Sequence, residues 1–127
     1  MSIERTETET KNILAILPGG PGAKETIVLG AHYDHLGYGG ANSAAPGETA
    51  VHHGADDNAS GTAMLVEVAR RLAAEAAAKG PFPRNILFVS FSGEERGLLG
   101  SAHYTANAAV PLAETVAMVN RSEEHNV

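Results

Sequence analysis

Two adjacent glutamates, Glu94 and Glu95, follow an apolar run in the segment "FVSFSGEERGLLGS" (residues 88–101). Like charges at the end of a buried strand repel each other and lose solvation, so they need a nearby cation or a proton. If one glutamate binds a divalent metal, the other can stay ionised and take a proton from a water that the metal activates. A solvated pair neutralised by Arg96 is the alternative that these residues leave open.

A histidine and an aspartate end the earlier apolar run "TIVLGAHYDH" (residues 26–35). His32 is the metal-ligand candidate of this segment. Asp34 lies two residues further on, hence on the same side of an extended chain, and could hold the other ring nitrogen of His32. The alternative is that His32 only ends a strand while Asp34 begins a turn. We expect His35 to be a loop residue.

A second acidic pair, Asp56 and Asp57, lies in the segment "HHGADDNASGTA" (residues 52–63). A carboxylate just before a helix is favoured by the helix dipole, which explains one of the two as a capping residue. Both cannot be caps, so the pair again indicates a cation. His52 and His53 precede the acids in the same loop, and we interpret them as solvated loop residues rather than ligands.

The elements around these clusters follow from hydrophobic patterning. Residues 13–17 and 26–31 read as strands that pair in an antiparallel hairpin, because Pro and Gly interrupt the chain between them. Residues 37–61 read as a long loop, which in a compact domain usually carries function. Residues 85–91 form a nearly continuous apolar run, typical of a strand covered on both faces. A short helix over 98–108 and a last strand over 114–120 complete the chain.

The clearest predicted helix lies between the long loop and the apolar strand. It can be capped by Ser60 or Thr62, and Gly80 followed by Pro81 ends it. Its apolar stripe consists of Leu65, Val68, Ala69 and Leu72.

The resulting order β-β-α-β-α-β predicts a three-layer αβα fold with a mixed, mostly parallel sheet. Ligands of open α/β sheets collect beyond the carboxyl ends of the strands, where all three polar clusters fall. One imidazole and several carboxylates from separate loops are the ligand set expected for zinc or a similar divalent ion.

Composition narrows the class of protein. The 127 residues suit one domain over 1–127, and the formal charge of −6 argues against a nucleic-acid partner. The chain has no cysteine, hence no thiolate ligand, and no apolar run of the roughly 20 residues that a membrane span needs. The first twelve residues lack the apolar core of a signal peptide, so the compartment stays undetermined. A nucleotide-binding domain is disfavoured because no Gly-rich turn joins a strand to a helix.

The segments "GAHYDHLGYG", "HHGADDNASGTA" and "SFSGEERGLLGS", in this order, resemble the M28-type zinc aminopeptidases, which are co-catalytic two-zinc exopeptidases. The resemblance covers roughly residues 11 to 120. It implies an αβα sandwich of the phosphorylase/hydrolase-like kind and two zinc ions bridged by an aspartate.

The resemblance also assigns a role to each candidate. It implies that His32 binds one zinc and that Asp34 orients this histidine. Asp57, directly before "NASG", corresponds to the bridging aspartate. Glu94 corresponds to the general base and Glu95 to a ligand of the other zinc.

The end of the chain departs from the family pattern. Ser122 stands where the family has a zinc-binding aspartate, and the last zinc histidine of the family would lie beyond residue 127. The resemblance implies that each zinc lacks one protein ligand. The chain could then bind only one ion or none, unless residues 123–125 replace the missing ligands. We expect a catalytic domain that is incomplete at the C-terminus, whose last strand has an open edge that favours self-association.

The sequence therefore predicts a zinc-dependent aminopeptidase that acts on a peptide or a small aminoacyl substrate. Carboxypeptidase-like and glutaminyl-cyclase-like specificities stay open, because no specificity pocket is legible in the sequence. The alternative from another class is a non-catalytic fragment that binds metal weakly or not at all.

Overall fold

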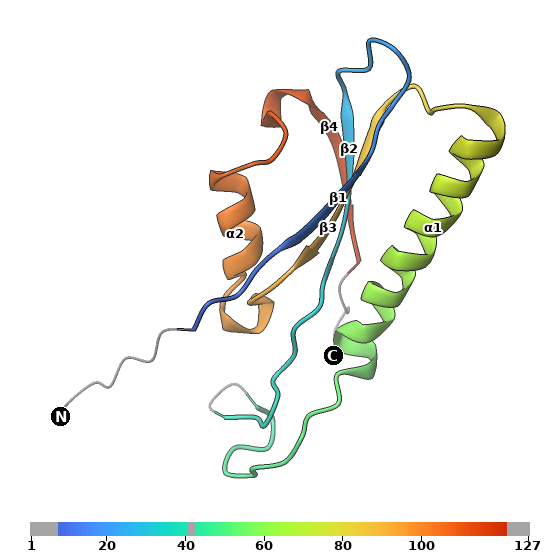
Figure 1. The fold of residues 1–127 in the computed structure, drawn as a ribbon. Coiled ribbons are helices and arrows are strands. Elements are labelled where there is room, and N and C mark those ends of the chain that lie inside the picture. Colours follow the sequence, from blue (N-terminus) through green and yellow to red (C-terminus); the bar gives the residue numbers. More distant parts are fainter. Residues whose placement is uncertain (1–7, 41–42, 122–127) are drawn as a thin grey trace.

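The computed structural model describes residues 8–40 and 43–121 (Figure 1). The order of strands and longer helices is the predicted one. The elements are β1 (Ile13–Leu17), β2 (Thr26–His32), α1 (Gly61–Lys79), β3 (Asn85–Phe91), α2 (Leu99–Ala106) and β4 (Thr115–Asn120). Short helical turns lie at Ala55–Ser60, Glu94–Arg96 and Leu112–Glu114. Within the described ranges, no helix combines the length and the apolarity that a membrane span requires.

The four strands form one mixed sheet in the order β1-β3-β2-β4. Strand β2 runs parallel to both β3 and β4, and only β1 is antiparallel to its neighbour. The predicted mostly parallel sheet is therefore confirmed. The predicted hairpin between residues 13–17 and 26–31 is wrong, because β1 pairs with β3 instead. Residues 86–89 of β3 are all buried, as expected for a central strand that is covered on both faces.

The two longer helices cover opposite faces of the sheet, so the predicted three layers are confirmed (Figure 1). The main buried cluster comprises Val28, Leu87, Val89 and Phe91 from the central strands and Tyr104 from α2. The rings of Phe91 and Tyr104 meet edge to face, with centroids 6.0 Å apart. Burial of each such large side chain contributes about 1.5–3 kcal/mol.

The helix α1 packs on the other face through the predicted stripe, whose four side chains are all partly buried. Ser60 is the N-cap residue, as expected, but its side chain makes no capping hydrogen bond. Ser60 Oγ donates to Asp56, and Thr62 Oγ1 donates to the carbonyl of His32. The side chain that accepts a backbone N–H of the first turn is Asn58, from Gly61 at 3.1 Å.

Strand β4 lies at one edge of the sheet and exposes Val116, Met118 and Val119. An edge with unpaired backbone groups and apolar side chains can pair with another chain. Self-association through this edge stays a prediction, which sedimentation over a range of protein concentrations would test. The expected substitutes at 123–125, like Ser122, lie outside the described residues.

Candidate metal centre

The parallel pairing of β2 and β3 brings two of the predicted clusters to one edge of the sheet. His32 stands opposite Phe91 at the end of both strands. The chain after each strand therefore leaves the sheet at the same place, where polar side chains of parallel sheets gather. His32 is buried, with 3% of its surface exposed, so its ring nitrogens need partners within the protein.

Asp34 connects the two strand ends. Its carboxylate accepts the backbone N–H groups of Glu94 at 3.2 Å and Glu95 at 3.3 Å. The backbone carbonyl of Asp34 lies 3.1 Å from Nδ1 of His32, while its carboxylate is 3.8 Å from this nitrogen. Asp34 thus orients His32 through its main chain and fixes the Glu94–Glu95 turn through its side chain. With Nδ1 donating to the carbonyl, Nε2 of His32 is left as an acceptor or ligand atom.

Asp57 lies between two imidazoles. Its Oδ1 is 3.1 Å from Nε2 of His32, and its Oδ2 is 3.8 Å from Nδ1 of His35. The next residue, Asn58, is 2% exposed and holds this segment against the sheet. Its amide group donates to the carbonyl of Arg121 at 2.8 Å and to that of His32 at 3.3 Å. The Asp57–Asn58 peptide bond is cis.

Glu95 faces the same group of residues from the turn after β3. Its Oε1 lies 2.7 Å from Nδ1 of His35, within ion-pair distance. Burial raises the pKa of Glu95, and the nearby charge of Asp57 raises it further, while His35 opposes this shift. A cation beside Glu95 would remove the penalty on its ionised form.

The resulting cluster differs in one member from the predicted set. Ligand atoms of His35, Asp57 and Glu95 all lie within 4.8 Å of one another, among the residues the structure describes. His32 contacts Asp57 from the other side and is not part of this group. We expected His35 to be a loop residue, and it lies just after β2, outside any helix or strand. Its imidazole nevertheless lies near Asp57, as does the imidazole of His32.

Glu94, the predicted general base, lies on the side of His32. The two residues line a small hollow of about 150 Å³ with Phe91, Leu98 and Met118, among others. A carboxylate beside apolar surface and a buried histidine can serve as a proton acceptor for a reaction in that hollow.

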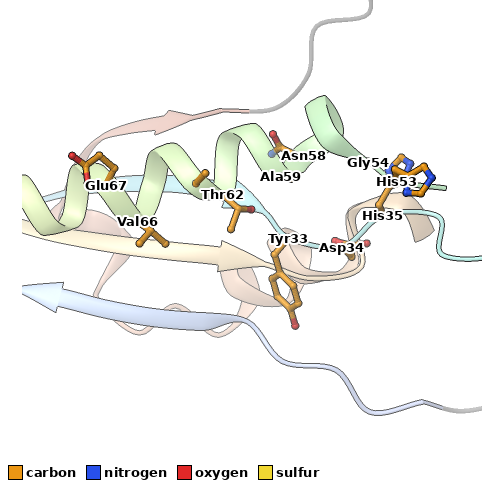
Figure 2. Close-up of a pocket in the computed structure, with 11 residues that line it drawn as sticks. Tyr33, Asp34, His35, His53, Gly54, Asn58, Ala59, Thr62, Val66 and Glu67 are labelled. Atoms are coloured by element: carbon orange, nitrogen blue, oxygen red, sulfur yellow. The ribbon is translucent and has the colours of Figure 1, made fainter. Parts of the chain in front are cut away.

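A larger hollow of about 580 Å³ opens on the side of His35 (Figure 2). Figure 2 shows His35 and His53 at one end of it, and Val66 and Glu67 along α1 at the other. His52 lies elsewhere and binds within its own loop, with Ser43 Oγ 2.6 Å from Nε2 and the Ala50 carbonyl 2.9 Å from Nδ1. The interpretation of His52 as a loop residue therefore agrees with its contacts.

The donor set fits a divalent cation. Imidazole nitrogens and carboxylate oxygens are the ligands of zinc sites without cysteine. The side chains of His35, Asp57 and Glu95 are between 16% and 23% exposed, which limits water competition and leaves room for an approaching ligand. Such a centre, at the carboxyl edge of an α/β sheet, has the chemistry of a metal-dependent hydrolase.

Comparison with known proteins agrees with this class. Residues 12–122 match the model of "Peptidase family M28". The match covers most of the chain, and the chain belongs to this peptidase family.

Three relatives carry aminopeptidase names. The chain is 42% identical to "Leucine aminopeptidase 1" of Ajellomyces capsulatus (strain H88) over 91 residues, which are 71% of this chain and 22% of the relative. It is 40% identical to "Leucine aminopeptidase 1" of Aspergillus oryzae over 91 residues, 71% of this chain and 21% of the relative. It is 34% identical to "Aminopeptidase YwaD" of Bacillus subtilis (strain 168) over 100 residues, 78% of this chain and 18% of the relative. The chain thus spans about a fifth of the length of these relatives.

Proposed function

We propose that this chain carries the metal-binding and catalytic residues of a zinc-dependent aminopeptidase. The observation that supports the proposal most is the position of Asp57. One of its carboxylate oxygens faces His32, and the other faces His35, which is grouped with Glu95. The aminopeptidase names of the relatives support the reaction class.

The residues have separate roles in this proposal. His32, Asp57 and Glu95 would hold zinc, and Asp34 would keep His32 and the Glu94–Glu95 turn in place through its hydrogen bonds. Bound zinc supplies a Lewis acid that polarises a carbonyl and lowers the pKa of water. Glu94 would accept the proton of the attacking water and return it to the leaving amine. The substrate class is a peptide or a small aminoacyl compound with a free amino group.

The decisive variant is Glu94→Gln, which keeps the size of the side chain and removes its basicity. We expect zinc content equal to wild type and a loss of about 100- to 10,000-fold in the hydrolysis of an aminoacyl anilide, the range for a general base. Glu75→Gln is the control, because Glu75 pairs with Lys79 on the exposed part of α1. Undiminished turnover in Glu94→Gln would remove Glu94 from this role. Zinc uptake by wild type without any turnover would favour the non-catalytic alternative.

A further inference from the structure

We propose that Arg96 determines substrate specificity by binding a carboxylate on the leaving side of the peptide bond that is cleaved. This carboxylate is either the C-terminal group of a short peptide or an acidic side chain close to the cleaved bond. The inference rests on the proposed function, because it assumes that the free amino end of a peptide is held at the candidate metal centre.

Arg96 carries a charge that the described part of the chain leaves unpaired. It directly follows Glu94 and Glu95, yet within residues 8–40 and 43–121 it forms no ion pair with these glutamates or with any other residue. The arginines that pair with glutamates are Arg70, Arg71 and Arg84. The contacts therefore do not support the alternative in which Arg96 neutralises the glutamate pair, and its guanidinium is available to an anion.

The backbone of Arg96 has a fixed place beside the candidate centre. It ends the short helical turn Glu94–Arg96, which lies between Gly93 with a φ of +69° and Gly97 with a φ of +97°. Glycine adopts such left-handed angles without steric cost. The carboxylate of Asp34 also accepts the backbone N–H groups of both glutamates of the turn. The side chain of Arg96 therefore starts from a defined position, one residue after the metal-ligand candidate of this turn.

Arg96 lines a hollow of about 650 Å³ that adjoins the candidate centre. Other residues that line it are Thr8, Thr10, Asp34, His35 and Ser92. His35 also lines the hollow of about 580 Å³ shown in Figure 2, so the two hollows meet at this histidine. A peptide that begins at the centre and extends past His35 has space there for its second and third residues, each of which spans about 3.3–3.6 Å.

A carboxylate is the anion that suits this hollow on a peptide substrate. A guanidinium presents a planar fork of N–H donors that matches the two oxygens of a carboxylate. The acid of the hollow, Asp34, already accepts a backbone N–H on each oxygen, which weakens its repulsion of an incoming anion. The hydroxyl groups of Thr10 and Ser92, which hydrogen-bond each other, add polar surface. Because the chain has a formal charge of −6, an acidic group needs a local cation, and Arg96 supplies it.

Equilibrium binding of peptides to the zinc-loaded chain, measured by calorimetry, tests the inference. Glu94→Gln serves as the background, so that bound peptides are not hydrolysed. Two matched pairs separate the sources of the carboxylate: Leu-Gly-Gly against its C-terminal amide, and Leu-Glu-Gly amide against Leu-Gln-Gly amide. The variants are Arg96→Gln and Arg96→Lys, the second of which keeps the charge without the planar fork. The control, Arg84→Gln, removes an arginine that pairs with Glu25 elsewhere on the surface.

We expect the carboxylate peptide of at least one pair to bind about 10-fold more tightly than its uncharged match, the lower end for a hydrogen bond to a charged group. Arg96→Gln should abolish this difference, Arg96→Lys should keep a part of it that falls as salt is added, and Arg84→Gln should keep all of it. Equal affinities within both pairs, a preference that survives Arg96→Gln, or no binding of any peptide would overturn the inference.

The proposed function is measured separately, through turnover of an aminoacyl anilide by the chain with Glu94 intact. The anilide has no carboxylate, so wild type and Arg96→Gln should hydrolyse it equally. A selective loss of anilide turnover in Arg96→Gln would also contradict a role limited to the carboxylate. Absence of turnover in both chains would count against the proposed function, while the peptide pairs still decide whether Arg96 binds a carboxylate.

Discussion

At the scale of single residues, Asn58 does the most to hold the centre together. Its side chain bonds the carbonyls of His32 and Arg121 and accepts the backbone N–H of Gly61. One amide group thus joins the end of β2, the segment after β4 and the start of α1. Asp57 is its immediate neighbour, so the position of the Asp57 carboxylate depends on these three hydrogen bonds.

We predict that Asn58→Ala lowers the free energy of unfolding by about 2–3 kcal/mol, because it leaves buried backbone groups without partners. Urea denaturation of the metal-free protein measures this change. The control is Asn107→Ala, whose exposed side chain donates to the carbonyl of His103, and whose loss should cost less than about 1 kcal/mol. Equal stabilities of Asn58→Ala and wild type would contradict the role of Asn58 as a connector.

At the scale of elements, strand ends supply His32 and the glutamate pair, and the segment before α1 supplies Asp57. The helix itself is stabilised along its exposed side by Glu67, which contacts Arg70 and Arg71 at 2.7 Å each. Hydrogen bonds from Arg70 and then Arg71 lower the pKa of Glu67 to about 2 from an ordinary value of 4.5. Pairs of this kind, three and four residues apart, each add a little to helix stability and are screened by salt.

A pH dependence follows from this depressed pKa. The contribution of Glu67 is fully present above pH 4.5, where the unfolded chain also carries the charge, and is lost as the pH falls through about 2. We predict that Glu67→Gln melts at a slightly lower temperature than wild type at pH 7, and that the difference disappears near pH 2. Thermal unfolding at both pH values, without and with 1 M salt, checks this. A difference that persists at pH 2 would show that Glu67 acts by packing, not by charge.

At the scale of the whole molecule, the order of the strands in the sheet decides which polar segments lie close together. The parallel neighbours β2 and β3 bring residues 32–35 beside residues 94–95, which are far apart in the chain. The antiparallel strand β1 closes one edge of the sheet, and β4 lies at the other.

Much of this arrangement could be predicted from the sequence, because parallel strands end at one edge and the polar clusters follow strand ends. The contact of Asp34 with the Glu94–Glu95 turn is of this kind. The segment before α1 reaches the same edge, where Asp57 contacts His32. The place of His35 could not be predicted, since its contacts are with Asp57 and Glu95, which lie far along the chain. The pairing of β1 was also missed, because the local turn signals favoured a hairpin with β2, whereas β1 pairs with the central strand β3.

The central claim is that imidazoles and carboxylates at the ends of β2 and β3 and in the segment before α1 bind zinc together. X-ray absorption at the zinc edge of the zinc-loaded chain tests it most directly. We expect nitrogen and oxygen ligands at about 2.0–2.2 Å with the outer-shell signal of imidazole rings, and loss of part of this signal in His32→Ala. A spectrum of hydrated zinc, with no imidazole contribution in the wild-type chain, would contradict the account.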